Sequence, residues 1–301
     1  MLLLAALALL QAPCPAPDTA TLFAPRLADS ARVYRGTFSA DGRTLYYFRK
    51  LRLERGAEDY RIMVARRQGS EWQAGEPLDL GGDYSDLYPS VSPDGKRLVF
   101  ASYRPAPGDT ASHPNAYLWY AERQGTGWGP PVFIGAAAQF GSYHSGPLIG
   151  KDYAIRFART SPDWTSTEVL VTRWDGTRYL PAVWAEGDDL RASWKAWRPA
   201  THYVWGGSLL DGGKAAVLDV SPLNDKGRRG PAQVWVTRRR DAGWTEPVLA
   251  GGGVNGAGWV NFIAPLPGNC GVLFVRDFSR FERVSLETLL APSREAPLRA
   301  P

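Results

Sequence analysis

The stretch "PSVSPDGKRLVFASYR", residues 89–104, decides the fold of this chain. Its Asp94-Gly95 pair separates a short strand-like segment from a second run that is rich in Val, Leu and Phe. An Asp-Gly pair between such segments is the strongest short-range signal for a β-hairpin, because both residues tolerate the positive φ that the turn needs. The stretch therefore predicts two antiparallel strands joined by a tight turn.

The same pattern recurs along the chain. Four further segments place a short strand, a tight turn and an apolar strand in that order: "GTFSADGRTLYYFRK" (36–50), "GPLIGKDYAIRFART" (146–160), "KAWRPATHYVWGG" (195–207) and "NFIAPLPGNCGVLFVRD" (261–277). A second unit with a strand, a charged turn, an aromatic residue and a Pro-containing strand follows four of the five: "MVARRQGSEWQAGEPLDLGG" (63–82), "WYAERQGTGWGPPVFIGA" (119–136), "LVTRWDGTRYLPAVWAEGD" (170–188) and "WVTRRRDAGWTEPVLAGG" (235–252). Their anchoring aromatics recur about every 50 to 65 residues, near the length of a propeller blade.

These repeats predict an all-β fold, a single β-propeller of five four-stranded blades, with six blades as the open alternative. The fifth blade ends at residues 280–290 without an aromatic-Pro strand, and the N-terminal segment "TLFAPRLADS" (21–30) supplies a candidate for it. A first strand that completes the last blade closes the ring and removes exposed sheet edges. We expect the propeller to span 21–290, with a surface loop at 211–231 and a flexible tail at 291–301.

The composition favours a folded, non-nucleic-acid-binding protein. The chain has 301 residues, of which 44% are hydrophobic and 22% charged, and 35 basic against 30 acidic residues give a formal net charge of +5. The run Arg238-Arg239-Arg240 occupies the charged turn of the second unit, so we interpret it as the solvated tip of an outer hairpin rather than as a nucleic-acid handle. We predict a monomer.

The N-terminal residues 1–20 resemble a secretory signal. The apolar run Leu2–Leu10 is too short to span a bilayer and has the length of a signal-peptide core, with candidate cleavage near Ala12, Ala16 or Ala20. This predicts a periplasmic or secreted protein without a transmembrane anchor in the mature chain. Lipidation at Cys14 and a merely frayed apolar terminus are the less favoured alternatives. If the segment is removed, Cys270 is the single cysteine and no internal disulfide forms.

The residues that carry a family resemblance lie in the second blade. "YPSVSPDGKRLVFAS" followed by "WYAERQGTGWGPPVFIG" resembles the Pro-Asp-Gly (WD-like) repeat of TolB-like β-propellers, and "EPLDLGGDYSDLYPSVSPDG" resembles propeller repeats found beside periplasmic peptidoglycan-binding modules. The resemblance implies a bacterial extracytoplasmic propeller that serves as a protein-interaction scaffold without catalysis. Family members commonly have six blades.

The segments that precede the inner strands are rich in aromatic and charged residues, although a scaffold needs only small and apolar ones there. Because these segments form a funnel on one face of a propeller, we predict a ligand site in the funnel. The candidate ligand-binding residues are Arg35, Tyr88, His144, Trp194, Lys195, Trp259 and Asn261. Such residues are typical interface anchors. The favoured function is non-catalytic binding of a protein, a peptide or a cell-envelope glycan, without a cofactor. In the alternative interpretation the side chains only fill and solvate the channel.

Recurring acids in the same segments support a rival function. Five-bladed propeller glycosidases set carboxylates from several blades around one bond, and Asp29, Asp86 and Asp189 are the candidates here. This function requires the three carboxylates to converge within about 5 to 10 Å. Asp also caps turns, and the acids would then have only that structural role. A weak cation site is a third possibility, but three scattered histidines make no metal signature.

Overall fold

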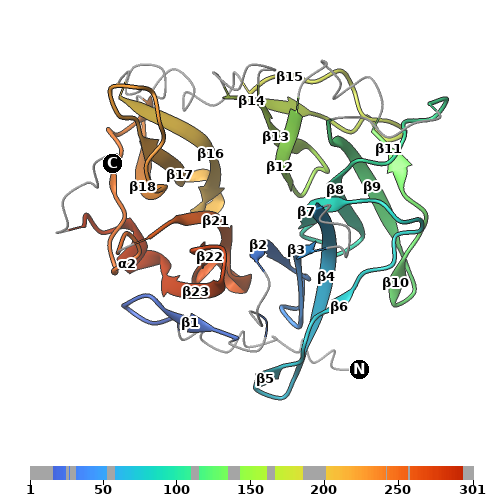
Figure 1. Ribbon diagram of the computed structural model, residues 1–301, viewed down its shortest axis with the longest axis horizontal. Helices are drawn as coiled ribbons and strands as arrows, with labels where there is room; N and C mark the ends of the chain where they lie inside the picture. The colour runs from blue at the N-terminus through green and yellow to red at the C-terminus, as the bar shows by residue number, and fades with distance from the viewer. Residues whose placement is uncertain are drawn as a thin grey trace, which may run out of the picture.

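The computed structural model describes residues 16–24, 27, 32–52, 58–109, 115–134, 143–160, 167–185, 201–241, 243–256 and 258–293. Its strands form five separate antiparallel sheets arranged as a ring, with one edge of each sheet at the axis (Figure 1). The chain is therefore an all-β, five-bladed β-propeller, as the repeats predicted, and the alternative of six blades is excluded.

Each blade runs from an inner strand at the axis to short strands at the rim. Blade 1 contains β2 (Val33–Phe38), β3 (Thr44–Arg52), β4 (Glu58–Gln68), β5 (Glu71–Trp72) and β6 (Glu76–Pro77). Blade 2 contains β7 (Asp86–Val91), β8 (Arg97–Ser102), β9 (Tyr117–Gln124), β10 (Gly127–Trp128) and β11 (Val132–Phe133). Blade 3 contains β12 (Tyr143–Ile149), β13 (Ile155–Thr160), β14 (Thr167–Thr172) and β15 (Val183–Trp184).

The last two blades complete the ring. Blade 4 contains β16 (His202–Leu210), β17 (Ala215–Pro222), β18 (Gln233–Arg240), β19 (Gly243–Trp244) and β20 (Val248–Leu249). Blade 5 contains β21 (Val260–Pro265), β22 (Gly271–Arg276), β23 (Arg280–Ser285) and the N-terminal β1 (Thr21–Phe23). Helical turns occupy η3 (Asp211–Gly213), η4 (Pro267–Asn269) and α2 (Leu286–Leu290). Among the described residues, no helix has the length and apolar character needed to cross a membrane.

The N-terminal strand closes the ring, as predicted. β1 pairs antiparallel with β23, with Thr21 opposite Arg283 and Phe23 opposite Phe281. Pro17 lies beside it, and its carbonyl accepts a hydrogen bond from the Ser285 amide at 2.8 Å. Cys270 is disulfide-bonded in this structure, whereas Cys14, the other cysteine of the chain, lies outside the described residues.

The Asp-Gly pairs make the predicted hairpins. Gly42 and Gly95 have φ of 67° and 73°, in the left-handed region that glycine enters without steric cost. In the second turn, the Asp94 carboxylate accepts hydrogen bonds from the Ser92 hydroxyl at 2.6 Å and the Lys96 amide at 3.1 Å. The local sequence thus fixes the turn geometry. At the rim of blade 4, Arg238–Arg240 are exposed at the end of β18, as expected for a hairpin tip.

Hydrophobic side chains pack between neighbouring blades. One cluster joins blades 1, 2 and 3 around Phe48, Phe100 and Phe157, all at most 1% exposed. A second cluster joins blades 4 and 5, and a third joins blades 5 and 1 around Tyr47 and Phe281. Burial of each such aromatic removes a large apolar area from water, so the interfaces between blades hold the ring together.

Blade 4 departs from the prediction. The interval 211–231 was expected to be a surface loop, but it contains β17, whose sequence "AAVLDVSP" is almost entirely buried. β17 is the second strand of the blade and pairs with β16 on one side and β18 on the other. The segment was predicted to be a loop because Gly-rich and charged residues flank an apolar run that has the ordinary length of a strand. The correction matters because β17 carries Asp219.

Candidate functional site

All five inner strands are interrupted at the same level. Each contains one residue more than the second strand that it pairs with, which is the definition of a β-bulge. The bulges lie at Arg35 in β2, 88–89 in β7, 146–147 in β12, Trp205 in β16 and 262–263 in β21. Because a bulge re-aims side chains and is frequent beside functional sites, this ring of five bulges defines a candidate axial site.

Two of the bulges hold large side chains in an unfavourable backbone conformation. Tyr88 and Phe262 have φ of 52° and 58°. The left-handed region costs about 1–2 kcal/mol for a residue other than glycine, so surrounding contacts must impose it. The rings supply such contacts: Tyr88 lies edge-on to Phe48 at 4.7 Å between centroids, and Phe262 lies edge-on to Tyr34 at 5.7 Å.

Arg35 crosses the axis from blade 1 to blade 3. Its Nη1 donates to the carbonyl oxygen of Gly146 at 3.4 Å, and its Nη2 is buried without a hydrogen-bond partner. Gly146 has φ of 56°, and a Cβ there would lie 2.8 Å from Arg35 Nη1, so this position favours glycine. Burial lowers the pKa of Arg35, whereas Asp219 and Tyr88 act in the opposite direction. An arginine stays charged under these conditions.

Asp219 faces the same cluster from β17 in blade 4. Its Oδ2 accepts a hydrogen bond from the Phe262 amide of blade 5 at 3.2 Å. Burial raises the pKa of Asp219 to about 7, although the Phe262 amide and Arg35 oppose the shift. The Asp219 residue nevertheless keeps partial solvent exposure. A carboxyl group half protonated at neutral pH is typical of functional sites.

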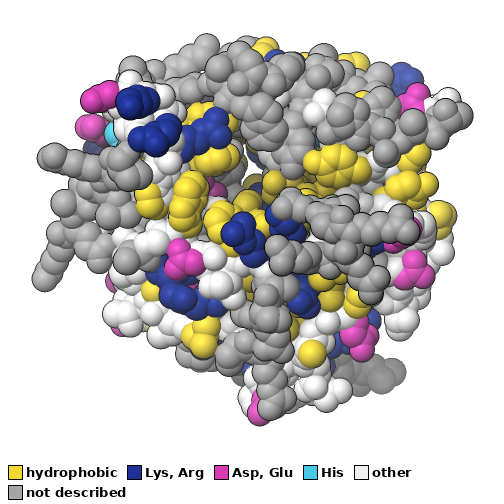
Figure 2. Space-filling model, in the orientation of Figure 1, with side chains coloured by type: hydrophobic (Ala, Val, Ile, Leu, Met, Phe, Trp, Pro, Cys, Tyr) yellow, Lys and Arg dark blue, Asp and Glu magenta, His cyan; other side chains and the backbone are white. Residues whose placement is uncertain are grey.

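A belt of aromatic rings surrounds this pair. The aromatic belt comprises Tyr34, Phe48, Tyr88, Trp205, Trp259, Phe262 and Phe278. Neighbouring ring centroids lie 4.7 to 6.3 Å apart from Trp205 in blade 4 through blades 5 and 1 to Tyr88 in blade 2. All but Tyr34 and Phe48 are partly exposed. Figure 2 shows hydrophobic and basic side chains next to one another at the centre of one face of the ring.

The structure brings some of the predicted site residues together. Arg35 and Tyr88 belong to the axial site, and Trp259 belongs to the aromatic belt. Asn261 directly precedes Phe262 and is 8% exposed, with its Oδ1 unpartnered. The other candidates, Trp194 and Lys195, lie outside the described residues.

His144 lies in the core of its blade. It is fully buried, its ring is edge-on to Phe157 at 5.1 Å, and neither ring nitrogen has a hydrogen-bond partner. Burial, with a smaller contribution from Arg159, lowers its pKa to about 4. The imidazole is therefore neutral at pH 7, and a ligand would reach it only after the packing around it had opened.

Of the three carboxylates proposed for a glycosidase, Asp86 alone lies within the described residues. Asp86 is held by Arg104, whose Nη2 lies 3.1 and 2.9 Å from its two carboxylate oxygens. Burial raises the pKa of Asp86, and Arg104 partly offsets this. Asp29 and Asp189 lie outside the described residues.

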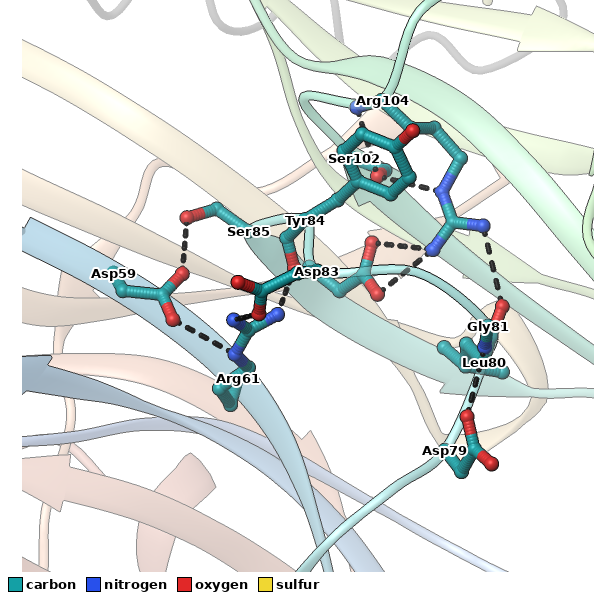
Figure 3. A network of polar contacts seen from close by, with 11 residues as sticks. Asp59, Arg61, Asp79, Leu80, Gly81, Asp83, Tyr84, Ser85, Ser102 and Arg104 are labelled. Carbon is teal, nitrogen blue, oxygen red and sulfur yellow. Dashed lines mark hydrogen bonds and ion pairs between the residues drawn. The ribbon is translucent and has the colours of Figure 1, made fainter.

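The segment that leads into β7 is fixed by two arginines (Figure 3). Arg104 Nη1 also donates to the Leu80 carbonyl, and Arg61 pairs with Asp59 at 2.7 Å and donates to the Tyr84 carbonyl at 2.5 Å. These contacts satisfy charges between blades 1 and 2, so we assign the network a structural role. Among the described residues, no group of three or more His, Cys, Asp or Glu is placed to hold a metal ion.

Sequence reasoning missed Asp219, Trp205, Phe262 and Phe278. For Asp219 a signal was present, because it is the single acid in the apolar run 215–222 and a buried acid needs a special reason. For the aromatic residues the signal was absent: their positions depend on bulges and on pairing between distant strands.

Comparisons with known proteins identify the fold but not the activity. No protein-family model and no curated protein matches the chain. The solved structure of a BT0996–RGII complex aligns over 95% of this protein and 95% of BT0996, with a TM-score of 0.55 and 11% identity. The catalytic domain of a GH62 α-L-arabinofuranosidase from Coprinopsis cinerea aligns over 91% of this protein and 100% of its own length, with a TM-score of 0.50 and 10% identity. These likenesses show the fold alone.

A structure of putative TolB from Agrobacterium tumefaciens also matches, over 81% of this protein and 69% of its own length, with a TM-score of 0.45 and 15% identity. The propeller fold implied by the TolB resemblance is confirmed by the five blades. Membership of a Pro-Asp-Gly repeat family remains a prediction, because no family model matches.

Proposed function

We propose that the protein is an extracytoplasmic binding protein that holds a cell-envelope glycan at its axial site without catalysis. The observation that carries the proposal is the aromatic belt around Arg35 and Asp219. Apolar rings combined with a few convergent polar groups are the usual lining of a small-ligand site. The strained Tyr88 and Phe262 support it, because backbone strain concentrates where ligands bind.

A sugar ring suits this combination of groups better than a protein surface does. Its CH faces pack against exposed aromatic rings, here Trp205, Trp259 and Phe262, and its hydroxyl groups both donate and accept hydrogen bonds. Arg35 Nη2 is a buried donor without a hydrogen-bond partner, and Asp219 supplies an acceptor or, when protonated, a donor. Because Arg35 Nη2 has no hydrogen-bond partner and Asp219 accepts from the Phe262 amide, a ligand hydroxyl could bridge the two groups.

The test is glycan binding by matched tryptophan variants. We expect isothermal titration of envelope oligosaccharides to give binding that Trp205→Ala and Trp259→Ala each weaken at least tenfold, equivalent to about 1.4 kcal/mol. Trp128→Ala is the control, because Trp128 lies at the rim of blade 2. If all three variants lose affinity equally, or if no variant loses affinity, the assignment is contradicted.

A glycosidase is the second candidate, and the pKa of Asp219 is the observation that favours it. A carboxylic acid with a pKa of about 7 can donate a proton to a leaving group at neutral pH. Turnover of a polysaccharide panel that is abolished in Asp219→Asn would establish this function. If the unmodified protein binds saccharides without hydrolysing them, the non-catalytic binding function is favoured.

Periplasmic or secreted localisation is part of the proposal. The apolar run Leu2–Leu10 supports it, because it has the length of a signal-peptide core. Fractionation of cells that make the protein should place it outside the cytoplasm. Recovery in the cytoplasmic fraction would oppose it.

A further inference from the structure

Arg35 presents a buried positive charge with an unused donor. The side chain is 8% exposed, its Nη1 reaches only the Gly146 carbonyl, and its Nη2 has no partner. Removing a guanidinium from water without satisfying its donors is costly, and such groups are normally paired. The unused nitrogen therefore indicates a ligand group that accepts hydrogen bonds.

The surroundings of Arg35 lack a fixed counter-ion among the described residues. Asp219 from β17 is the negative group that acts on it, and Tyr88 from β7 contributes weakly. The Asp219 carboxyl is engaged by the Phe262 amide of β21 instead of by the guanidinium. When Asp219 holds a proton, the axial site carries a net positive charge.

Further arginines lie along the aromatic belt. The Arg32 guanidinium lies 5.8 Å from the ring centroid of Phe278, and the Arg229 guanidinium lies 4.8 Å from that of Trp205. Arg32 is exposed and Arg229 partly so. A negatively charged ligand that rests on the belt would thus lie near the positive charges of Arg35, Arg32 and Arg229.

We propose that the ligand of the axial site is an acidic sugar, a uronic acid residue whose carboxylate binds Arg35 Nη2 while its ring packs on the aromatic belt. The proposal deepens the proposed glycan-binding function and rests on it. A planar carboxylate matches the guanidinium fork.

The same geometry couples binding to a proton. A ligand carboxylate beside Arg35 also approaches Asp219, and two neighbouring carboxylates favour the protonation of one of them. Asp219 then takes up a proton from solvent and donates a hydrogen bond to the ligand. With its pKa at about 7, the protonated fraction falls about tenfold between pH 6 and pH 8. We expect the affinity for the acidic sugar to fall by about the same factor.

Calorimetry with matched ligands tests the proposal. The probes are oligosaccharides of glucuronate and of galacturonate, their methyl esters, the neutral glucose and galactose counterparts, and inorganic phosphate. We expect an acid to bind at least tenfold more tightly than its ester at pH 6. Arg35→Gln should abolish this preference, Arg35→Lys should retain part of it, and the rim variant Arg239→Gln should leave it intact. Asp219→Asn should remove the decline in affinity toward pH 8.

The outcomes separate the two proposals. Equal binding of acids, esters and neutral sugars that Trp205→Ala weakens would overturn the acidic-sugar assignment and keep glycan binding. Binding of phosphate as strong as that of the acids would also overturn the assignment, in favour of a general anion site. If no saccharide binds, both proposals fail. If Arg35→Gln does not fold, the pH profile of Asp219→Asn decides, and a profile identical to that of the unmodified protein contradicts the assignment.

Discussion

Replacement of Asp219 by Asn should stabilise the fold increasingly as the pH rises. The pKa of Asp219 is about 7 in the folded protein, against an ordinary value of 3.8. Between these values the folded state binds more protons than the unfolded state, so this group lowers stability as the pH rises and the loss is complete above pH 7. Asn keeps an oxygen that can accept the Phe262 amide hydrogen bond but never ionises.

The magnitude follows from the same two values. At about 1.4 kcal/mol per pKa unit, the advantage of Asp219→Asn should grow by about 3 kcal/mol between pH 4.5 and pH 8.5. Because Asp219 is partly exposed, solvent screening reduces the expected growth to about 2 kcal/mol.

Urea unfolding of both proteins across this pH range measures the difference. Subtracting the two curves removes the contributions of all other titrating groups, including His144. Asp225→Asn is the control, since Asp225 is exposed at a turn. A difference for Asp219→Asn that is constant with pH, or that favours Asp219 at pH 8.5, would refute the assignment of a buried, proton-holding carboxyl.

Three further predictions concern the rest of the fold. The pKa of His144 is lowered to about 4, so the free energy of unfolding should fall by about 3 kcal/mol as the pH falls from 6.5 to 4. In urea unfolding, His144→Phe should reduce this loss of stability at acidic pH. An unchanged loss would contradict the prediction. The Arg97 guanidinium packs on four aromatic rings at 4.1 to 5.6 Å. Arg97→Ala should therefore lower the free energy of unfolding, measured in urea, by about 3 kcal/mol. A loss below about 0.5 kcal/mol would show that these ring contacts do not stabilise the fold. Gly146→Ala should destabilise by at least about 1 kcal/mol in thermal unfolding, because of its φ of 56° and the 2.8 Å approach to Arg35; unchanged stability would show that the axis relaxes freely.

The sequence predicted those features that are encoded locally. Asp41-Gly42 and Asp94-Gly95 specify their turns through backbone conformation and through hydrogen bonds between residues close in sequence. Both hairpins were therefore recognisable from a few residues. Ring closure was also predictable, because the fifth blade lacked a strand and the segment around Phe23 could supply it.

The axial site was only half predictable, for a physical reason. Arg35 and Tyr88 were predicted because they lie in segments that contain more aromatic and charged residues than a scaffold needs. Asp219 was missed because its strand lies between Gly-rich and charged flanks. Its raised pKa comes from burial, opposed by the Phe262 amide and Arg35 from other blades. A contact between residues so distant in sequence leaves no local pattern.

The most direct test of the account is a crystal structure of the protein with its tightest-binding saccharide. We predict the sugar ring on Trp205, Trp259 or Phe262, with its polar groups within hydrogen-bond distance of Arg35 Nη2 and the Asp219 carboxyl. A saccharide bound at the rim of a blade, with Arg35 and Asp219 untouched, would contradict the central claim that the axis is the binding site.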